Sequence, residues 1–338
     1  MTTLKDVARA AGVSAQTVSN VVNNRAVVRL ETRQRVLEAL DRLGYRPNLA
    51  ARGLRQRQAR ALAFLVVDPS PRYLADPFHG SVLSGLADVA RERGYGLVIQ
   101  GLRPGGGGGR RLSDVFRHTQ IDGAVVTLGG TAGERRRHLG DLRRGGGPFV
   151  LLEQSVGARD DAACVLGRNR SGAEAVTRHL LAAGHRHFGF VIPSLPWPAV
   201  EERLRGFHAA LTAHGAPTSA HVTRCGPEDP EAARQATETL LRTHRRVTAV
   251  LGANDLLAVG ALDATRRLGR RCPADVAVVG FDDLDIARWV QPPLTTVRLP
   301  GDEMGRRAAD LLIARLETGR FRRRRLEVPT ELVVRAST

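Results

Sequence analysis

The chain has 338 residues, 42% of them hydrophobic, which is enough for a small domain and two medium-sized ones with separate cores. No apolar run approaches the roughly 20 residues of a bilayer-spanning helix, and the polar start MTTLKDVARA lacks the order of a secretory signal, so we expect a cytoplasmic protein without a membrane segment. The formal charge of +17 comes almost wholly from arginine, and residues 1–60 hold twelve Lys and Arg against four Asp and Glu, which favours nucleic acid as a partner.

Residues 4–23, LKDVARAAGVSAQTVSNVVN, predict two short helices joined by a turn. Thr3 and Asp6 have capping-box spacing for a helix that begins at Leu4, and Gly12 supplies the turn. Ser14 is placed to cap the second helix. This is the layout of a DNA-reading helix-turn-helix, although the helix spacing alone fits an ordinary helical hairpin as well.

The second helix is expected to have a buried and an exposed side. Its inward residues are Val18, Val21 and Val22. Its residues near or on the exposed side are Ala15, Gln16, Thr17, Ser19 and Asn20. A third amphipathic segment, Thr32 to Leu43, completes a mini-domain of about 45 residues, with one apolar stripe made of Val36, Leu37, Leu40 and Leu43.

Residues 46–60 contain Arg-Pro-Asn, a short apolar stretch and a polar tract, and we interpret them as a hinge and a domain boundary. Beyond the hinge, apolar strands alternate with amphipathic helices. The expected strands lie near 61–67, 97–100, 123–128, 149–152, 188–192, 249–253 and 276–280. Such alternation predicts parallel sheets covered on both faces, and two Rossmann-like subdomains rather than one very wide sheet.

Gly105 to Gly109 follow a strand, as a phosphate-binding loop would. Arg110, however, stands where a dinucleotide fingerprint needs its third glycine, so we interpret this segment as a surface loop. The run from Arg322 to Arg325 is interpreted as a solvated turn rather than a second DNA site.

The N-terminal motif and GYRPNLAARGL at 44–54 resemble the headpiece of the LacI/GalR family of transcriptional regulators. The resemblance continues in family order through motifs at 76–95, 121–126, 179–190, 203–207, 253–262, 276–283 and 292–297. It implies a small all-α helix-turn-helix headpiece and a periplasmic-binding-protein-like α/β core of two Rossmann-like subdomains. The implied divisions are a headpiece at 1–45, a hinge helix and linker at 46–60, and an effector-binding and dimerisation core at 61–338. Three chain crossings would place 61–161 plus 293–322 in subdomain one and 162–292 plus 323–338 in subdomain two.

The resemblance also implies a DNA-binding set. The positions that match base-reading residues are Ala15, Gln16 and Asn20, and the two amides have the groups to pair with adenine. Phosphate or capping contacts are expected from Ser14, Thr17, Ser19 and Asn23, with plain solvated positions as the alternative. Asn48 lies in the hinge, and Leu54 matches the family's apolar wedge, which enters the minor groove when two subunits bring their hinges together.

Three polar residues match the family's ligand contacts: Arg203 in RLRGF, Asn254 in ANDLL and Asp282 in GFDD. Together they can hold adjacent hydroxyls or an anionic group, which implies a sugar, a sugar derivative or a nucleoside-like metabolite. Phe78 and Trp197 are candidates to cover a sugar face, with a core or loop role as the alternative for each. The loop at 68–77 is longer than the usual family spacing, so the ligand's identity stays open.

We therefore expect a repressor that binds a palindromic double-stranded operator as a homodimer and responds to a small-molecule effector. An enzyme is one alternative, but no nucleophile elbow, P-loop or complete metal motif appears. A secreted sugar-binding protein is another, and it would need no helix-turn-helix. We expect no cofactor and no metal, because the histidines lack cysteine or carboxylate partners, and we interpret Cys164, Cys225 and Cys272 as packing residues. The last segment carries no leucine heptad, which favours a dimer over a tetramer.

Overall fold

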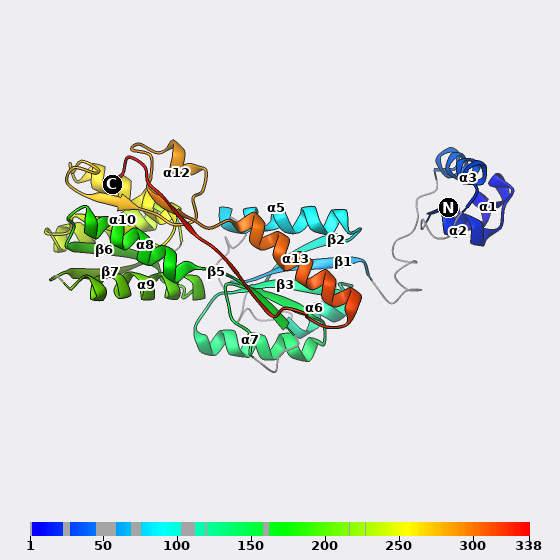
Figure 1. Cartoon of the computed structure of the whole chain (residues 1–338), viewed down its shortest axis with the longest axis horizontal. Helices are drawn as coiled ribbons and strands as arrows, with labels where there is room; N and C mark the ends of the chain where they lie inside the picture. Colours follow the sequence, from blue (N-terminus) through cyan, green and yellow to red (C-terminus); the bar gives the residue numbers. More distant parts are fainter. Residues whose placement is uncertain are drawn as a thin grey trace. The chain divides into compact units, whose positions relative to one another are not determined.

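The computed structural model describes residues 2–22, 28–44, 59–68, 76–102, 112–118, 120–157, 162–215, 217–226 and 228–338. The chain forms two compact units, Met1–Ala59 and Arg60–Thr338 (Figure 1). Most of the expected hinge and the Gly105 to Gly109 loop lie outside the described residues. Among the described helices, none has the length and apolar character that a membrane crossing requires.

The first unit contains α1 (Leu4–Ala11), α2 (Ala15–Val22) and α3 (Leu30–Arg42). Its centre is formed by Val7, Val18 and Val36, none of which has any exposed surface. The predicted capping box is confirmed, because the Asp6 amide donates to Thr3 Oγ1 at 3.3 Å and the Thr3 amide donates to Asp6 Oδ2 at 2.9 Å. The predicted turn is confirmed as well, since Gly12 has a φ of +64°.

The third helix differs from expectation in two ways. It begins at Leu30 rather than Thr32. Leu37 is 48% exposed instead of lying in the apolar stripe. The buried Ala39 takes the place of Leu37 in the stripe. Residues three, four and seven positions after Val36 lie on the same face of the helix as Val36, whereas Leu37, one position after it, is turned about 100° away.

The first sheet has the strand order β11-β5-β4-β3-β1-β2, and every neighbouring pair is parallel. Its strands are β1 (Ala61–Val67), β2 (Gly96–Leu102), β3 (Gly123–Leu128), β4 (Phe149–Leu152), β5 (Ala162–Gly167) and β11 (Arg325–Val328). Alternate residues of β1 face opposite cores. Leu62, Phe64 and Val66 join the cluster with α5 (Pro77–Glu92) and α13 (Gly301–Thr318). The other face is covered by α6 (Leu112–His118) and α7 (Ala132–Gly145).

The second sheet has the order β7-β6-β8-β9 and is also parallel throughout. Its strands are β6 (His187–Pro193), β7 (Ser219–Cys225), β8 (Ala249–Gly252) and β9 (Ala277–Val279). On one face lies α9 (Pro198–His214), whose Phe207 ring is 5.2 Å from that of Phe190. On the other lies α10 (Pro230–Thr243), whose Leu240 fills the space beside Gly189. Two further helices, α8 (Asn169–Ala182) and α11 (Asp255–Arg267), pack against α9 and α10 respectively.

The expected fold class of the core is confirmed, but three expected crossing points are wrong. Strand β5, expected in subdomain two, pairs with β4 in the first sheet, and β11 pairs with β5. Strand β10 (Thr296–Arg298), expected in subdomain one, instead pairs with β12 (Glu331–Val333) and bridges to Asp282 beyond β9. The chain therefore crosses after β5, after β10 and after β11 (Figure 1). A short helix, α12 (Ile286–Trp289), completes the second subdomain.

Candidate functional site

Helix α2 presents the residues expected to read DNA. Gln16 is exposed, and its Nε2 donates to Asn20 Oδ1 at 3.1 Å across one helical turn. The other expected residues of the helix, Ala15, Thr17 and Ser19, are partly exposed. Ser14 caps the helix as predicted, since its Oγ accepts the Thr17 amide at 3.1 Å. Asn23, Asn48 and Leu54 lie outside the described residues.

In the core, all five residues expected to contact an effector line one cavity of about 60 Å³ between the two subdomains. Phe78 comes from α5, and the other four, Trp197, Arg203, Asn254 and Asp282, come from the second subdomain. Further described lining residues are Asp76, His79, Thr127, Glu153, Pro198, Ala199, Val200 and Glu228. Glu153, Asn254 and Asp282 lie just beyond the carboxyl ends of β4, β8 and β9, where open parallel sheets bind ligands.

Arg203 and Asp282 form a buried ion pair at the centre of the cavity. The Arg203 guanidinium donates to Asp282 Oδ1 at 2.7 Å and lies 3.8 Å from the centre of the Phe281 ring. Asp282 follows β9 with a φ of +103°, a conformation that costs about 1–3 kcal/mol in a residue other than glycine. Burial raises the pKa of Asp282 to about 6, and Arg203 opposes that rise. The strained backbone therefore holds a carboxylate against its guanidinium partner.

Asn254 connects a helix start to a second carboxylate. Its Oδ1 accepts the Leu257 amide at 3.0 Å as the N-cap of α11, which leaves Nδ2 to donate to Glu228 Oε1 at 2.7 Å. Part of Glu228 is accessible, but its carboxyl group lies in the cavity. Burial, assisted by the nearby carboxylates of Asp76 and Asp282, raises the pKa of Glu228 to about 8.

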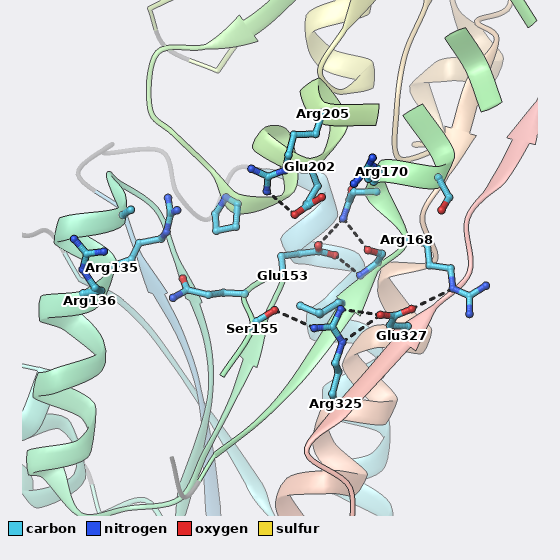
Figure 2. Close-up of a pocket in the computed structure, with 17 residues that line it drawn as sticks. Arg135, Arg136, Glu153, Ser155, Arg168, Arg170, Glu202, Arg205, Arg325 and Glu327 are labelled. Carbon is cyan, nitrogen blue, oxygen red and sulfur yellow. Dashed lines mark hydrogen bonds and ion pairs between the residues drawn. The ribbon is translucent and has the colours of Figure 1, made fainter. Parts of the chain in front are cut away.

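Glu153 connects the two subdomains. It follows β4, and its carboxylate accepts the Gly167 amide at 3.0 Å and Asn169 Nδ2 at 2.6 Å (Figure 2). Asn169 Oδ1 in turn accepts from Arg203 Nε at 2.9 Å. Burial raises the pKa of Glu153 to about 7. A continuous chain of hydrogen bonds thus leads from the end of the first sheet through Asn169 and Arg203 to Asp282.

Aromatic rings form the other side of the cavity. Trp197 lies edge-on to the ring of His79, with 6.2 Å between centroids, and packs against Gly129, where a Cβ would come within 3.0 Å of the indole. Phe78 lies beside His79, with 6.3 Å between centroids. Trp197 therefore packs against the protein and also lines the cavity. This position supports both interpretations of the residue, as a ring that covers a ligand and as a packing residue.

The cavity is rich in carboxylic acids. Among the described lining residues, four are carboxylic acids, Asp76, Glu153, Glu228 and Asp282, and only Arg203 and His79 can carry positive charge. Because Asp282 already engages the guanidinium, the expectation that this site holds an anionic group is not favoured. Acceptor-rich walls suit hydroxyl or ammonium donors instead.

Two contacts join the subdomains near the cavity. The Gly130 amide donates to the Pro196 carbonyl at 3.0 Å, and Arg135 of α7 pairs with Glu201 of α9 at 3.1 Å. These two contacts hold the subdomains together beside the cavity.

A second and larger hollow, of about 670 Å³, lies at the edge of the same cleft (Figure 2). Glu153 lines both spaces. Six arginines line this hollow: Arg135, Arg136, Arg168, Arg170, Arg205 and Arg325. The two spaces therefore differ in the sign of their lining charge.

Sequence reasoning missed Glu153, Glu228 and His79. Glu153 directly follows the expected strand 149–152, so its place at a strand's carboxyl end could have marked it as a candidate. Glu228 lies in a loop before α10, and no local pattern distinguishes it from a solvated loop residue.

Comparisons with known proteins agree with this architecture. Residues 3–48 match the model of bacterial regulatory proteins of the lacI family, and residues 177–338 match a periplasmic binding protein-like domain. The chain is 33% identical over 341 residues to the HTH-type transcriptional regulator CelR of Thermobifida fusca, covering 99% of this chain and 98% of that protein.

Two solved structures resemble the whole chain. One is a complex of the transcriptional regulator CelR with cellobiose, with a TM-score of 0.74, 31% identity and full coverage of both chains. The other is a lac repressor dimer bound to operator and the anti-inducer ONPF, with a TM-score of 0.82, 27% identity, and coverage of 100% of this chain and 99% of that one. The fold and sites define a DNA-binding regulator with a separate sensor core. The chain belongs to the LacI/GalR family of transcriptional regulators, whose members are regulators and not enzymes.

Proposed function

We propose that this regulator is a homodimeric repressor that binds a palindromic operator and responds to an uncharged or cationic polyhydroxylated effector, such as a sugar or amino sugar. One observation carries the effector assignment: the five expected contact residues line one cavity, whose other lining residues include the carboxylic acids Asp76, Glu153 and Glu228. Support for the ligand class comes from the CelR structure, which contains cellobiose. Support for the operator and the dimer comes from the lac repressor structure.

At the DNA end, residues 1–45 form the DNA-binding domain and 46–60 the hinge. The second helix enters the major groove, where Ala15, Gln16 and Asn20 contact base edges. The bond between Gln16 and Asn20 pre-orients both amides, and each is free to exchange that partner for a base. Leu54 acts as the minor-groove wedge. A cytoplasmic location belongs to the same proposal, because the operator lies in that compartment.

At the effector end, residues 61–338 bind the ligand and form the dimer. Donors on the ligand pair with Asp282 and Glu228, Arg203 and Asn254 supply complementary donors, and Trp197 and Phe78 cover an apolar face. Subdomain movement on binding then changes the spacing of the two hinges. A ligand needs about 5.5 kcal/mol of differential affinity to move a two-state population from 1:99 to 99:1.

The test begins with genomic DNA fragments that the full-length protein retains, whose sequencing and footprinting give the operator. We expect an inverted repeat of about 14–20 base pairs and an affinity that falls steeply with salt. Fluorescence anisotropy then follows operator binding during titration with cellobiose, ribose, galactose, glucosamine and glucuronate. The neutral or cationic members should include the one that changes operator affinity, and glucuronate should have no effect.

Arg203→Ala should abolish that response and leave operator binding within a few fold. The matched control is Arg242→Ala, an exposed arginine of α10 that pairs with Glu238 and does not line the cavity. A single half-site bound at full affinity would exclude the dimeric model. Loss of operator binding by a folded Arg203→Ala protein would instead mean that Arg203 stabilises the conformation that binds DNA.

A further inference from the structure

The larger hollow has walls from both subdomains, and we call it the arginine hollow. Arg135 and Arg136 of α7 and Arg325 of β11 belong to the first subdomain. Arg168, Arg170 and Arg205 belong to the crossing segment and helices of the second. The remaining lining residues are Ala132, Glu153, Gln154, Ser155, Leu166, Gly167, Asn169, Ser171, Pro198, Glu202 and Glu327. Figure 2 shows the labelled arginines on opposite sides of the hollow.

Guanidinium groups outnumber the carboxylates that pair with them. Arg168 and Arg325 share the single carboxylate of Glu327, at 3.4 and 2.8 Å (Figure 2). Arg170 likewise shares Glu174 with Arg178, at 3.2 and 2.7 Å.

The other three arginines of the hollow share no carboxylate with another arginine among the described residues. Arg136 is exposed and has no ion-pair partner among the described residues. Arg205 forms an ion pair with Glu202, and Arg135 forms one with Glu201. A guanidinium carries five donors, so one carboxylate shared between two of them leaves several donors without a partner in the protein and open to a ligand. The hollow therefore keeps a net positive charge and free donors.

Backbone amide groups add to the positive electrostatic potential of the hollow. Helix α8 starts at the hollow, where Asn169, Arg170 and Ser171 of its first turn are lining residues. No side chain caps this 14-residue helix. The amides of a first helical turn have no partner within the helix, and its N-terminus carries a partial positive charge. Ser155, which accepts from Arg325 at 3.3 Å, and Ser171 provide hydroxyl groups beside it.

We propose that the arginine hollow is a second ligand site, which binds a multivalent phosphate-type anion such as pyrophosphate or a phosphorylated metabolite. Arg325 belongs to the first subdomain, whereas Arg170 and Arg205 belong to helices of the second, so one anion bound among them contacts both subdomains and favours the closed arrangement. The acidic effector cavity rejects such a ligand, so this site is independent of the proposed effector.

Isothermal titration of the full-length protein tests this proposal, with sodium pyrophosphate, inorganic phosphate and glucose 6-phosphate as probes at constant ionic strength. The three probes distinguish free phosphate from a phosphorylated metabolite. The basic headpiece also attracts anions, so the comparison of variants decides the outcome. The test variant is Arg168→Gln/Arg325→Gln, and the matched control is Arg242→Gln on α10, another exposed arginine paired with a glutamate.

For the double variant we expect pyrophosphate affinity to fall at least about tenfold, or about 1.4 kcal/mol, because two charged hydrogen-bond donors are removed. The control should stay within about twofold, which is the ordinary effect of losing a surface charge. Arg170→Gln, which leaves the Glu327 cluster intact, should give a smaller loss and serves if the double variant fails to fold. Unchanged affinity in the folded variants, equal loss in the control, or no binding of any probe by the natural protein would overturn the proposal.

Discussion

Glu228→Gln should make the ligand-free protein more stable at high pH. The isosteric amide can still accept the bond from Asn254 Nδ2, but it cannot become an anion in a cavity that already holds Asp76 and Asp282. Burial raises the pKa of Glu228 from 4.5 to about 8. The folded protein therefore binds more protons than the unfolded chain, and the associated stability is lost as the pH rises from about 4.5 to about 8.

The size of the expected gain in unfolding free energy follows from this pKa shift. At 1.36 kcal/mol per pKa unit, the rise from 4.5 to about 8 sets an upper value of about 5 kcal/mol. Relaxation and water penetration reduce the penalty of a buried charge, so we expect a gain of about 2–5 kcal/mol at pH 9 and little difference at pH 5. This stability difference is measured by urea unfolding at fixed protein concentration and at pH 5, 7 and 9, with circular dichroism as the signal.

Glu231→Gln is the matched control, three residues further along the chain. Hydrogen bonds from Arg234 and Gln235 lower the pKa of Glu231 to about 2, so its charge favours the folded state above that pH, and its removal should not stabilise the protein. A Glu228→Gln protein that loses stability at pH 9, or that keeps the natural protein's dependence on pH, would refute the reasoning.

Gly206→Ala should cost about 1–3 kcal/mol of stability, because its Cβ would lie 2.2 Å from the Arg170 carbonyl and force α8 and α9 apart; an unchanged urea midpoint would contradict this packing. Arg135→Met removes the ion pair with Glu201 across the cleft and should accelerate effector association in stopped-flow experiments, whereas an unchanged rate would mean that this pair does not restrain opening. Gln16→Ala should reduce base discrimination by about 1–3 kcal/mol at two symmetric operator positions, as measured by competition with substituted operators. Leu54→Ala should lose most operator-specific affinity and DNA bending but keep full effector binding; normal bending by this variant would exclude the wedge.

The sequence alone determined the local features of both ends of the molecule. The capping box of Thr3 and Asp6, the turn at Gly12 and the Ser14 cap depend on residues only a few positions apart, so the pattern contains all the information that these features need. The alternation of strands and helices likewise predicted parallel sheets, and the resemblance to known regulators indicated Arg203, Asn254 and Asp282, which line one cavity.

Only the tertiary structure decided where the chain crosses between the subdomains and what surrounds the ligand cavity. Residues 162–167 belong to the first sheet because they pair with β4, and residues 325–328 belong to it because they pair with 162–167, a segment far away in the sequence. Burial, together with the carboxylates of Asp76 and Asp282, raises the pKa of Glu228, and Glu153 reaches Arg203 through Asn169. Burial and charge at such a site are sums over side chains from separate elements, and no local spacing of residues contains that sum.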